Sequence, residues 1–165
     1  MPTLEIREAT GDDFVFAWQL YVENAAPCIP HWSESKERSR FGDTWKTRDN
    51  GIVSVDADRI GWFACVASKS RLSIEHLYLT KGNRGIPTMI LDLLVNRAAL
   101  NNQKVWLSCL KKDPSFKFLS SEGFPSTEGS DERVSVDISD AFSHSHKKWV
   151  KSQLPWEEKW RTSHV

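Results

Sequence analysis

The chain has 165 residues, of which 39% are hydrophobic and 27% are charged, a composition typical of one folded domain around one core. Lysine plus arginine and aspartate plus glutamate number 22 each, so the zero net charge gives no long-range attraction for nucleic acid. No apolar run is long enough to cross a membrane, and the N-terminal residues lack the apolar stretch of a signal peptide. We therefore expect neither a membrane nor a nucleic acid as partner.

The hydrophobic patterns of the first 80 residues alternate between strands and helices. Apolar and polar residues that alternate predict a strand, whereas apolar residues three and four positions apart predict a helix. Thr10 and the acidic pair after it are typical of a helix start, and Pro27 of a helix end. In chain order the predicted elements are a strand at 3–9, helices at 10–26 and 33–47, a turn at 49–51, a hairpin of strands 52–55 and 60–67, and a strand at 71–79.

Residues 86–100 give the clearest helical pattern of the chain. One face of this helix is apolar, formed by Ile86, Met89, Ile90, Leu93, Leu94 and Ala98. Strands are predicted at 104–110 and 133–138, with a short helix at 115–122 that ends at Gly123. The strand, helix and strand over 71–110 predict a parallel pair with a right-handed crossover. The fold class is therefore α/β (α+β), a mixed and mostly antiparallel sheet flanked by helices.

The three cysteines and the histidines carry little functional signal. Cys65 and Cys109 fall in apolar runs, where a buried free thiol is the usual state, and such cysteine usage fits a cytoplasmic protein. His144, His146 and His164 have no cysteine or carboxylate at ligand spacing, so we predict no metal site.

The segment from Leu79 to Leu91 has the form of an anion site. A strand enters a turn with glycines at 82 and 85, and a helix follows directly. The first amides of a helix have no partner within it, and their dipoles favour an anion at that end. Glycines let the backbone approach a phosphate closely, because no Cβ intervenes. The sequence therefore predicts a site for a phosphate-bearing cofactor here.

This segment resembles the pyrophosphate-binding motif of the GNAT superfamily of N-acetyltransferases, Gln/Arg-x-x-Gly-x-Gly/Ala. In that register Gly82 takes the Gln/Arg position, Gly85 the first glycine and Pro87 the last small residue, and 88–91 match the family's helix start. Residues 118–124 resemble the family's Phe-Tyr-x-x-x-Gly-Phe motif. The element order over 3–139 also agrees, including Gly61 early in the third strand.

The resemblance implies an acyl-CoA-dependent N-acyltransferase that moves an acetyl group from acetyl-CoA to a primary amine of a small molecule or a protein. It implies Glu75, on the fourth strand, as the base and the amide near Leu79 as the oxyanion donor. Alternation would put Glu75 on the face of Leu77 and Leu79. The implied cofactor-binding residues are Leu79, Gly82, Asn83, Arg84, Gly85, Ile86 and Thr88.

Two departures from the family pattern weaken this implication. Pro87 has no N–H to offer a diphosphate, although proline suits the first turn of a helix. Leu119 stands where the family often has a tyrosine that protonates the leaving thiolate. Two alternatives therefore stay open. One is a catalytically decayed GNAT-fold binding or assembly module, by analogy with small phage proteins and so in a host cytoplasm or a virion. The other is a regulatory module that binds CoA without turnover.

Residues 140–165 extend beyond the acyltransferase-like domain of residues 1–139. Apolar residues here approximate a helical stripe, so we expect a tryptophan-rich helical tail. Aromatic side chains in a charged tail either pack on their own domain or anchor a protein partner or a second copy. The residues concerned are Phe142, Trp149, Val150, Leu154, Trp156 and Trp160.

Overall fold

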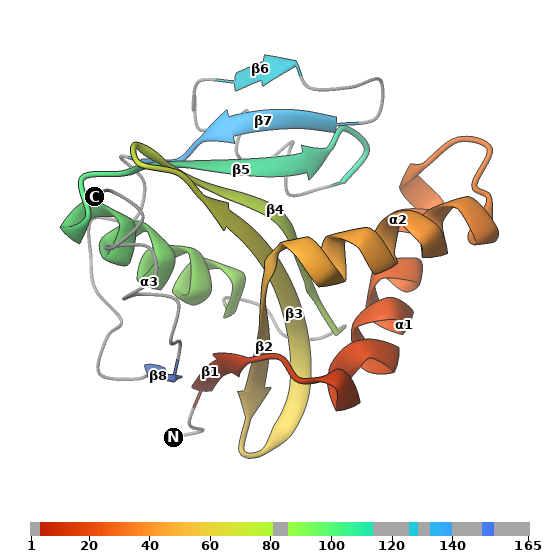
Figure 1. Ribbon diagram of the computed structural model, residues 1–165, viewed down its shortest axis with the longest axis horizontal. Coiled ribbons are helices and arrows are strands. Elements are labelled where there is room, and N and C mark those ends of the chain that lie inside the picture. Colours follow the sequence, from red (N-terminus) through yellow and green to blue (C-terminus); the bar gives the residue numbers. More distant parts are fainter. Residues whose placement is uncertain (1–3, 81–85, 114–125, 129–132, 140–149, 154–165) are drawn as a thin grey trace.

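A computed structural model shows a mixed sheet with helices on both faces (Figure 1), and it describes residues 4–80, 86–113, 126–128, 133–139 and 150–153. The strands lie in the order β6-β7-β5-β4-β3-β2-β1-β8. Only β4–β5 and β1–β8 are parallel pairs among these strands, so the predicted mostly antiparallel sheet is confirmed. The elements are β1 (Leu4–Glu8), the short 3-10 helix η1 (Gly11–Asp13), α1 (Phe14–Ala25), the 3-10 helix η2 (Ala26–Cys28), α2 (Glu34–Thr47), β2 (Asp49–Val55), β3 (Asp58–Ala67), β4 (Arg71–Leu79), α3 (Ile86–Leu100), β5 (Lys104–Leu110), β6 (Ser126–Glu128), β7 (Arg133–Asp137) and β8 (Val150–Gln153).

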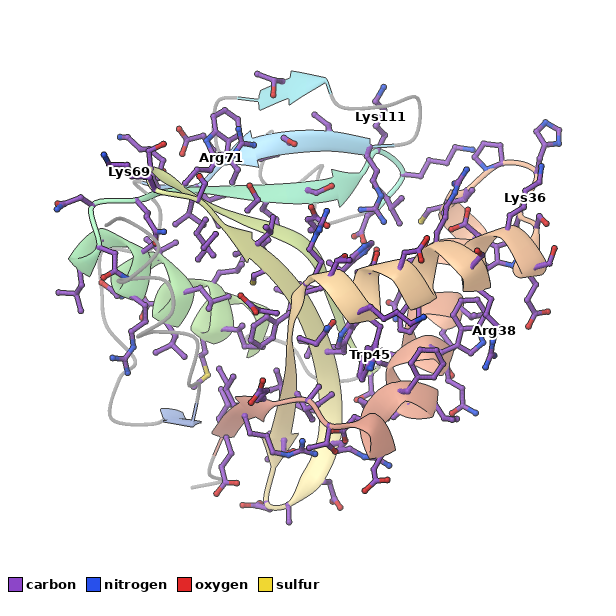
Figure 2. The ribbon with its side chains drawn as sticks, in the orientation of Figure 1. Lys36, Arg38, Trp45, Lys69, Arg71 and Lys111 are labelled. Carbon is purple, nitrogen blue, oxygen red and sulfur yellow. The ribbon has the colours of Figure 1, made fainter. Side chains whose placement is uncertain are left out.

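Each face of the sheet carries its own apolar core. On one face α3 packs through Met89, Ile90, Leu93, Leu94 and Ala98 of its predicted apolar side, and Ile90, Leu94 and Ala98 are fully buried. On the other face α1 and α2 cover an aromatic cluster around Tyr21, Phe41 and Trp62. Figure 2 labels Trp45 on the side of α2 turned toward α1. Its ring contacts Phe14 edge-on and stacks on Phe41. The crossover of β4, α3 and β5 thus places α3 opposite the two N-terminal helices (Figure 1).

The N-terminal strand is tied to α1 through one buried carboxylate. Asp13 is 2% exposed and accepts two hydrogen bonds from the Arg7 guanidinium at 2.7 and 2.9 Å. Arg59 of β3 donates to the same carboxylate at 3.2 Å, and the Thr10 N–H donates at 2.9 Å. These donors hold the pKa of Asp13 well below its usual range, chiefly through the Arg7 hydrogen bonds. Asp13 therefore joins three segments of the chain.

Residues 49–51 form strand β2 instead of the predicted turn. The prediction relied on an Asp-Asn-Gly sequence, but tertiary contacts satisfy these polar residues within the sheet. Asn50 is buried, and its amide donates to the Trp45 and Arg48 carbonyls at 3.0 Å each. Its side-chain oxygen accepts from the Trp62 indole at 3.0 Å. The true hairpin turn lies at Asp56 and Ala57, as predicted, with φ of 50° and 72°.

The described part of the C-terminal tail is a strand, which corrects the predicted helix at those positions. β8 lies parallel to β1 at the edge of the sheet, with Leu4 opposite Val150. An edge strand presents unpaired N–H and C=O groups, and an extended segment satisfies them while a helix does not. The rest of the tail and the predicted helix at 115–122 lie outside the described residues. The described helices include none long and apolar enough to span a membrane.

Replacing Gly51 by alanine is expected to lower the free energy of unfolding by about 1–3 kcal/mol, because the added carbon would enter the ring of Phe63. Phe63 is fully buried and cannot swing into water. Urea unfolding followed by circular dichroism measures the change. The matched control is Gly42→Ala in α2, where a Cβ meets nothing within 4 Å, and which should stabilise by about 0.5–1 kcal/mol. Equal effects of the two changes would contradict this account.

Candidate active site

A β-bulge in β4 decides which side chains face the two sides of the sheet. Ala64 of β3 pairs with His76, whereas the next residue, Cys65, pairs with Ile74, so Glu75 is the extra residue. The prediction that Glu75 shares a face with Leu77 and Leu79 is therefore wrong. Both leucines pack into the core on the α3 side, whereas Glu75 bonds Arg48 beside α2. The bulge turns Glu75 to the same side as His76.

The sheet opens between β4 and β5. The two strands pair in parallel from Arg71 and Lys104 as far as Ile74 and Leu107, where their described pairing ends. Both strands continue beyond that point, β4 to Leu79 and β5 to Leu110. The backbone edge of β4 beyond the bulge thus faces an opening instead of a neighbouring ladder. An extended ligand could reach backbone hydrogen-bonding groups there.

The amides of Leu77 and Leu79 point toward this opening. The Thr80 N–H donates to the Ile60 carbonyl of β3 at 2.7 Å. Because N–H groups along a strand alternate between its two edges, the Leu79 and Leu77 N–H groups point away from β3. Gly61 lies opposite Leu79, and a Cβ on it would collide with the Leu79 side chain. The glycine therefore makes room for Leu79, the predicted oxyanion donor.

Glu75 is held by an ion pair on the α2 side of the sheet. Its carboxylate accepts a hydrogen bond from Arg48 Nε at 2.8 Å, and the two side chains are 30% and 33% exposed. Arg48 follows the last turn of α2, so this helix sets the position of the carboxylate. The hydrogen bond from Arg48 reaches only one of the two carboxylate oxygens, and a carboxylate can accept several hydrogen bonds.

Arg133 lies at the centre of the polar groups next to the opening. Its guanidinium donates to the Glu75 carbonyl and to Ser108 Oγ, each at 3.3 Å. It also lies 3.2 Å from the Tyr78 hydroxyl and 3.3 Å from His76 Nδ1. Arg133 was not predicted as a site residue. The available signal is alternation in β7: Val134 and Val136 are buried on the α3 side, which leaves Arg133 to face α2.

His76 is a neutral imidazole in this cluster. Burial, with the positive charges of Arg133 and Arg48 nearby, holds the pKa of His76 well below its usual value. The ring also stacks on Trp62 with centroids 5.3 Å apart. Because Arg133 donates to Nδ1, the hydrogen-bond network assigns the imidazole hydrogen to Nε2.

Two hollows on this face meet at His76 and Arg133. The first has a volume of about 320 Å³ and is lined by Arg71, Ser73, Ile74, Glu75, His76, Trp106, Ser108, Arg133 and Ser135. The second, about 400 Å³, lies against α1 and α2 and includes Tyr21, Ile29 and Glu37. Figure 2 labels Arg71 near the far end of β4 from α2, where its guanidinium lies over the Trp106 ring at 4.6 Å. Both hollows are large enough for a small molecule.

Of the predicted cofactor-binding residues, the structure describes part. Leu79 lies at the opening, and α3 begins at Ile86 as predicted, so the backbones of Ile86 and Thr88 belong to its first turn. The predicted residues Gly82, Asn83, Arg84 and Gly85 lie outside the described residues. Ile29, between η2 and α2, lines the second hollow. Groups of three or more potential metal ligands are absent from the described residues.

No protein-family model matches the sequence, and no curated protein matches it. Solved structures do match. A GNAT family acetyltransferase from Elizabethkingia anophelis with acetyl-CoA bound has a TM-score of 0.60 at 11% identity, covering 82% of this chain and 96% of its own. The PaiA N-acetyltransferase of Thermoplasma acidophilum in complex with coenzyme A has a TM-score of 0.56 at 14% identity, covering 82% and 98%. RimL, a ribosomal L7/L12 alpha-N-protein acetyltransferase in complex with coenzyme A, has a TM-score of 0.57 at 15% identity, covering 82% of this chain and 92% of its own.

These matches define the class of fold. The chain has the fold of the GNAT N-acetyltransferases, and the low identities agree with its degenerate motifs. The resemblance stated from the sequence is therefore confirmed at the level of the fold. Similarity at this level of identity carries no residue roles and no acceptor, so those rest on the geometry of this chain.

Proposed function

We propose that the protein is an acyl-CoA-dependent N-acyltransferase that transfers an acetyl group to a primary amine. The observation that carries the proposal is the opening beyond Ile74, which the amides of Leu77 and Leu79 face. α3 begins at Ile86, seven residues further along the chain than Leu79, and supplies the first-turn amides for an anion. A carboxylate and a small-molecule hollow lie beside that opening. Together these groups suit a thioester that carries a diphosphate, as acetyl-CoA does.

The residues of the chain take separate parts in the reaction. Bound acetyl-CoA would supply the acetyl group as a thioester; the amine nitrogen joins the acetyl carbon while the carbon–sulfur bond breaks. Glu75 takes the proton that the amine loses. The amide of Leu79, with that of Leu77, donates to the carbonyl oxygen as negative charge develops on it. The leaving thiolate recovers a proton from water or from Ser108, which lines the same hollow.

One observation favours the alternative of a non-enzymatic GNAT-fold protein. Arg133 donates to the Glu75 carbonyl at 3.3 Å, so a side chain of the protein already satisfies one backbone group of β4 beyond its last described pair with β5. A binding or assembly module, or a CoA sensor, would tolerate such a contact. In an enzyme the same contact would place Arg133 beside the proposed base, Glu75.

Titration with acetyl-CoA tests the proposal first. We expect saturable thermal stabilisation, worth about 2.7 kcal/mol at a ligand concentration of 100 times Kd. S-acetylpantetheine, which lacks the diphosphate, is the matched control and should stabilise far less. Release of free thiol with a panel of primary amines then separates an enzyme from a sensor. No stabilisation by acetyl-CoA would leave the assembly module as the better account.

A further inference from the structure

The Arg133 guanidinium faces the hollow without a carboxylate partner in the described structure. Its contacts are a main-chain carbonyl, a serine, a neutral histidine and the hydroxyls of Tyr21 and Tyr78. The two carboxylates that line a hollow together with Arg133, Glu75 and Glu37, are engaged by other groups. Glu75 pairs with Arg48, and Glu37 with Arg40 and the Tyr21 hydroxyl. The groups that contact the guanidinium directly are therefore neutral.

Such an arrangement is costly for a charge that is partly removed from water. A buried ion is normally paired, because the neutral dipoles around it replace only part of its hydration. A carboxylate matches a guanidinium well, because two parallel N–H···O bonds can form, and a phosphate can pair in the same way. The geometry thus favours a ligand that brings its own negative charge.

The other groups lining the first hollow agree with an anionic ligand. Arg71 adds a second positive charge, and the one acidic residue of the lining, Glu75, is neutralised by Arg48. Ser108 and Ser135 lie directly opposite each other on β5 and β7, and both line the hollow. Their hydroxyls can donate to carboxylate oxygens. The volume of about 320 Å³ suits a compact molecule.

We propose that Arg133 binds the carboxylate of the acceptor, so that the acceptor is a free amino acid whose amine and carboxylate are close together. Arg133 touches Glu75 through the Glu75 carbonyl, so the anion site and the proposed base belong to one patch of the sheet. Because Arg133 and Glu75 line the same hollow, an amino acid held by its carboxylate at Arg133 would have its amine in the hollow that Glu75 borders. This inference rests on the proposed function for the transfer step, whereas the binding of the carboxylate does not.

Matched pairs of free amino acids and their carboxamides test the inference, with thiol release as the readout. We expect the wild-type protein to prefer the acid in kcat/KM by about 10–100-fold, the range for a charge-assisted hydrogen-bond pair. Arg133→Gln should remove this preference by lowering kcat/KM for the acid only, and Arg133→Lys should restore part of it. Equal use of acid and carboxamide by the wild type, or an equal loss of both in Arg133→Gln, would overturn the inference. Circular dichroism and the acetyl-CoA titration establish that each variant is folded.

Calorimetry of the same amino acids with the protein alone separates this inference from the proposed function. Saturable binding of an amino acid that fails in its carboxamide and in Arg133→Gln supports the anion site even where no amine releases thiol. If amines that lack a carboxylate release thiol and amino acids do not, the acyltransferase function is supported and the inference is contradicted. Absence of both binding and turnover for every amino acid also overturns it.

Discussion

Replacing Glu75 by glutamine is expected to lower kcat for acetyl transfer by about 10²–10⁴-fold, the range for the loss of a general base. The acetyl-CoA concentration that gives half of the thermal stabilisation should not change, because the Glu75 side chain faces α2 while the amides of Leu77 and Leu79 face the opening. Steady-state thiol release with the best amine of the panel measures the loss. Stability should change by less than about 1 kcal/mol, since the lost ion pair with Arg48 is partly exposed on both sides.

His76 is the competing base on the same hollow, and His76→Gln is the matched control for Glu75→Gln. Its Nδ1 accepts from Arg133, so its remaining ring nitrogen carries the hydrogen and has no lone pair to offer an amine. Its lowered pKa further weakens it as a proton acceptor. We therefore expect His76→Gln to retain much more activity than Glu75→Gln. The reverse order would transfer the role of base to the histidine.

Replacing Asp13 by asparagine is expected to destabilise the fold by about 3 kcal/mol, near the lower end of the cost of removing one partner from a buried ion pair. The value lies at that end because Arg7 and Arg59 are 38% and 41% exposed and regain water. For a domain of this length Tm should fall by about 10 °C. Asp12→Asn, one residue earlier and exposed, is the control and should change Tm by little. Scanning calorimetry measures both variants.

The pH dependence of this effect follows from the lowered pKa of Asp13. Above the unfolded-state pKa of about 3.9 the carboxylate is ionised in both states, so its full stabilising contribution is present. As pH falls below that value, the unfolded chain binds a proton that the folded protein does not, and the contribution is lost. The stability difference between wild type and Asp13→Asn should therefore shrink as pH falls from about 5 toward 3. A difference that stays constant over this range would show that Asp13 acts without its charge.

Local patterns were sufficient for most of the elements. The apolar face of residues 86–100 predicted α3 with the bounds that the structure has, because six apolar positions at helical spacing must be buried together. The parallel pairing of β4 with β5 was predicted from the helix that connects them. Cys65 and Cys109 are buried thiols, as their apolar neighbours indicated. The phosphate-binding loop at 82–85 stays a prediction, since it lies outside the described residues.

Long-range contacts decided what the local patterns missed. Asn50 and Gly51 form a turn in many sequences, but here Trp62 and Phe63 of the next strand hold them in β2. The four residues of β8 take their conformation from the open edge of β1, which no pattern in the tail encodes.

By itself the sequence determined the α/β class, the order of most elements and the place where a helix start follows a strand. Only the tertiary structure decided that the Glu75 side chain faces α2 and that Arg133 donates to the Glu75 carbonyl. The physical reason is the bulge opposite Ala64 and Cys65. One extra residue reverses the alternation of side chains along a strand. The position of such a bulge depends on how two strands pair, which the sequence of one strand does not show.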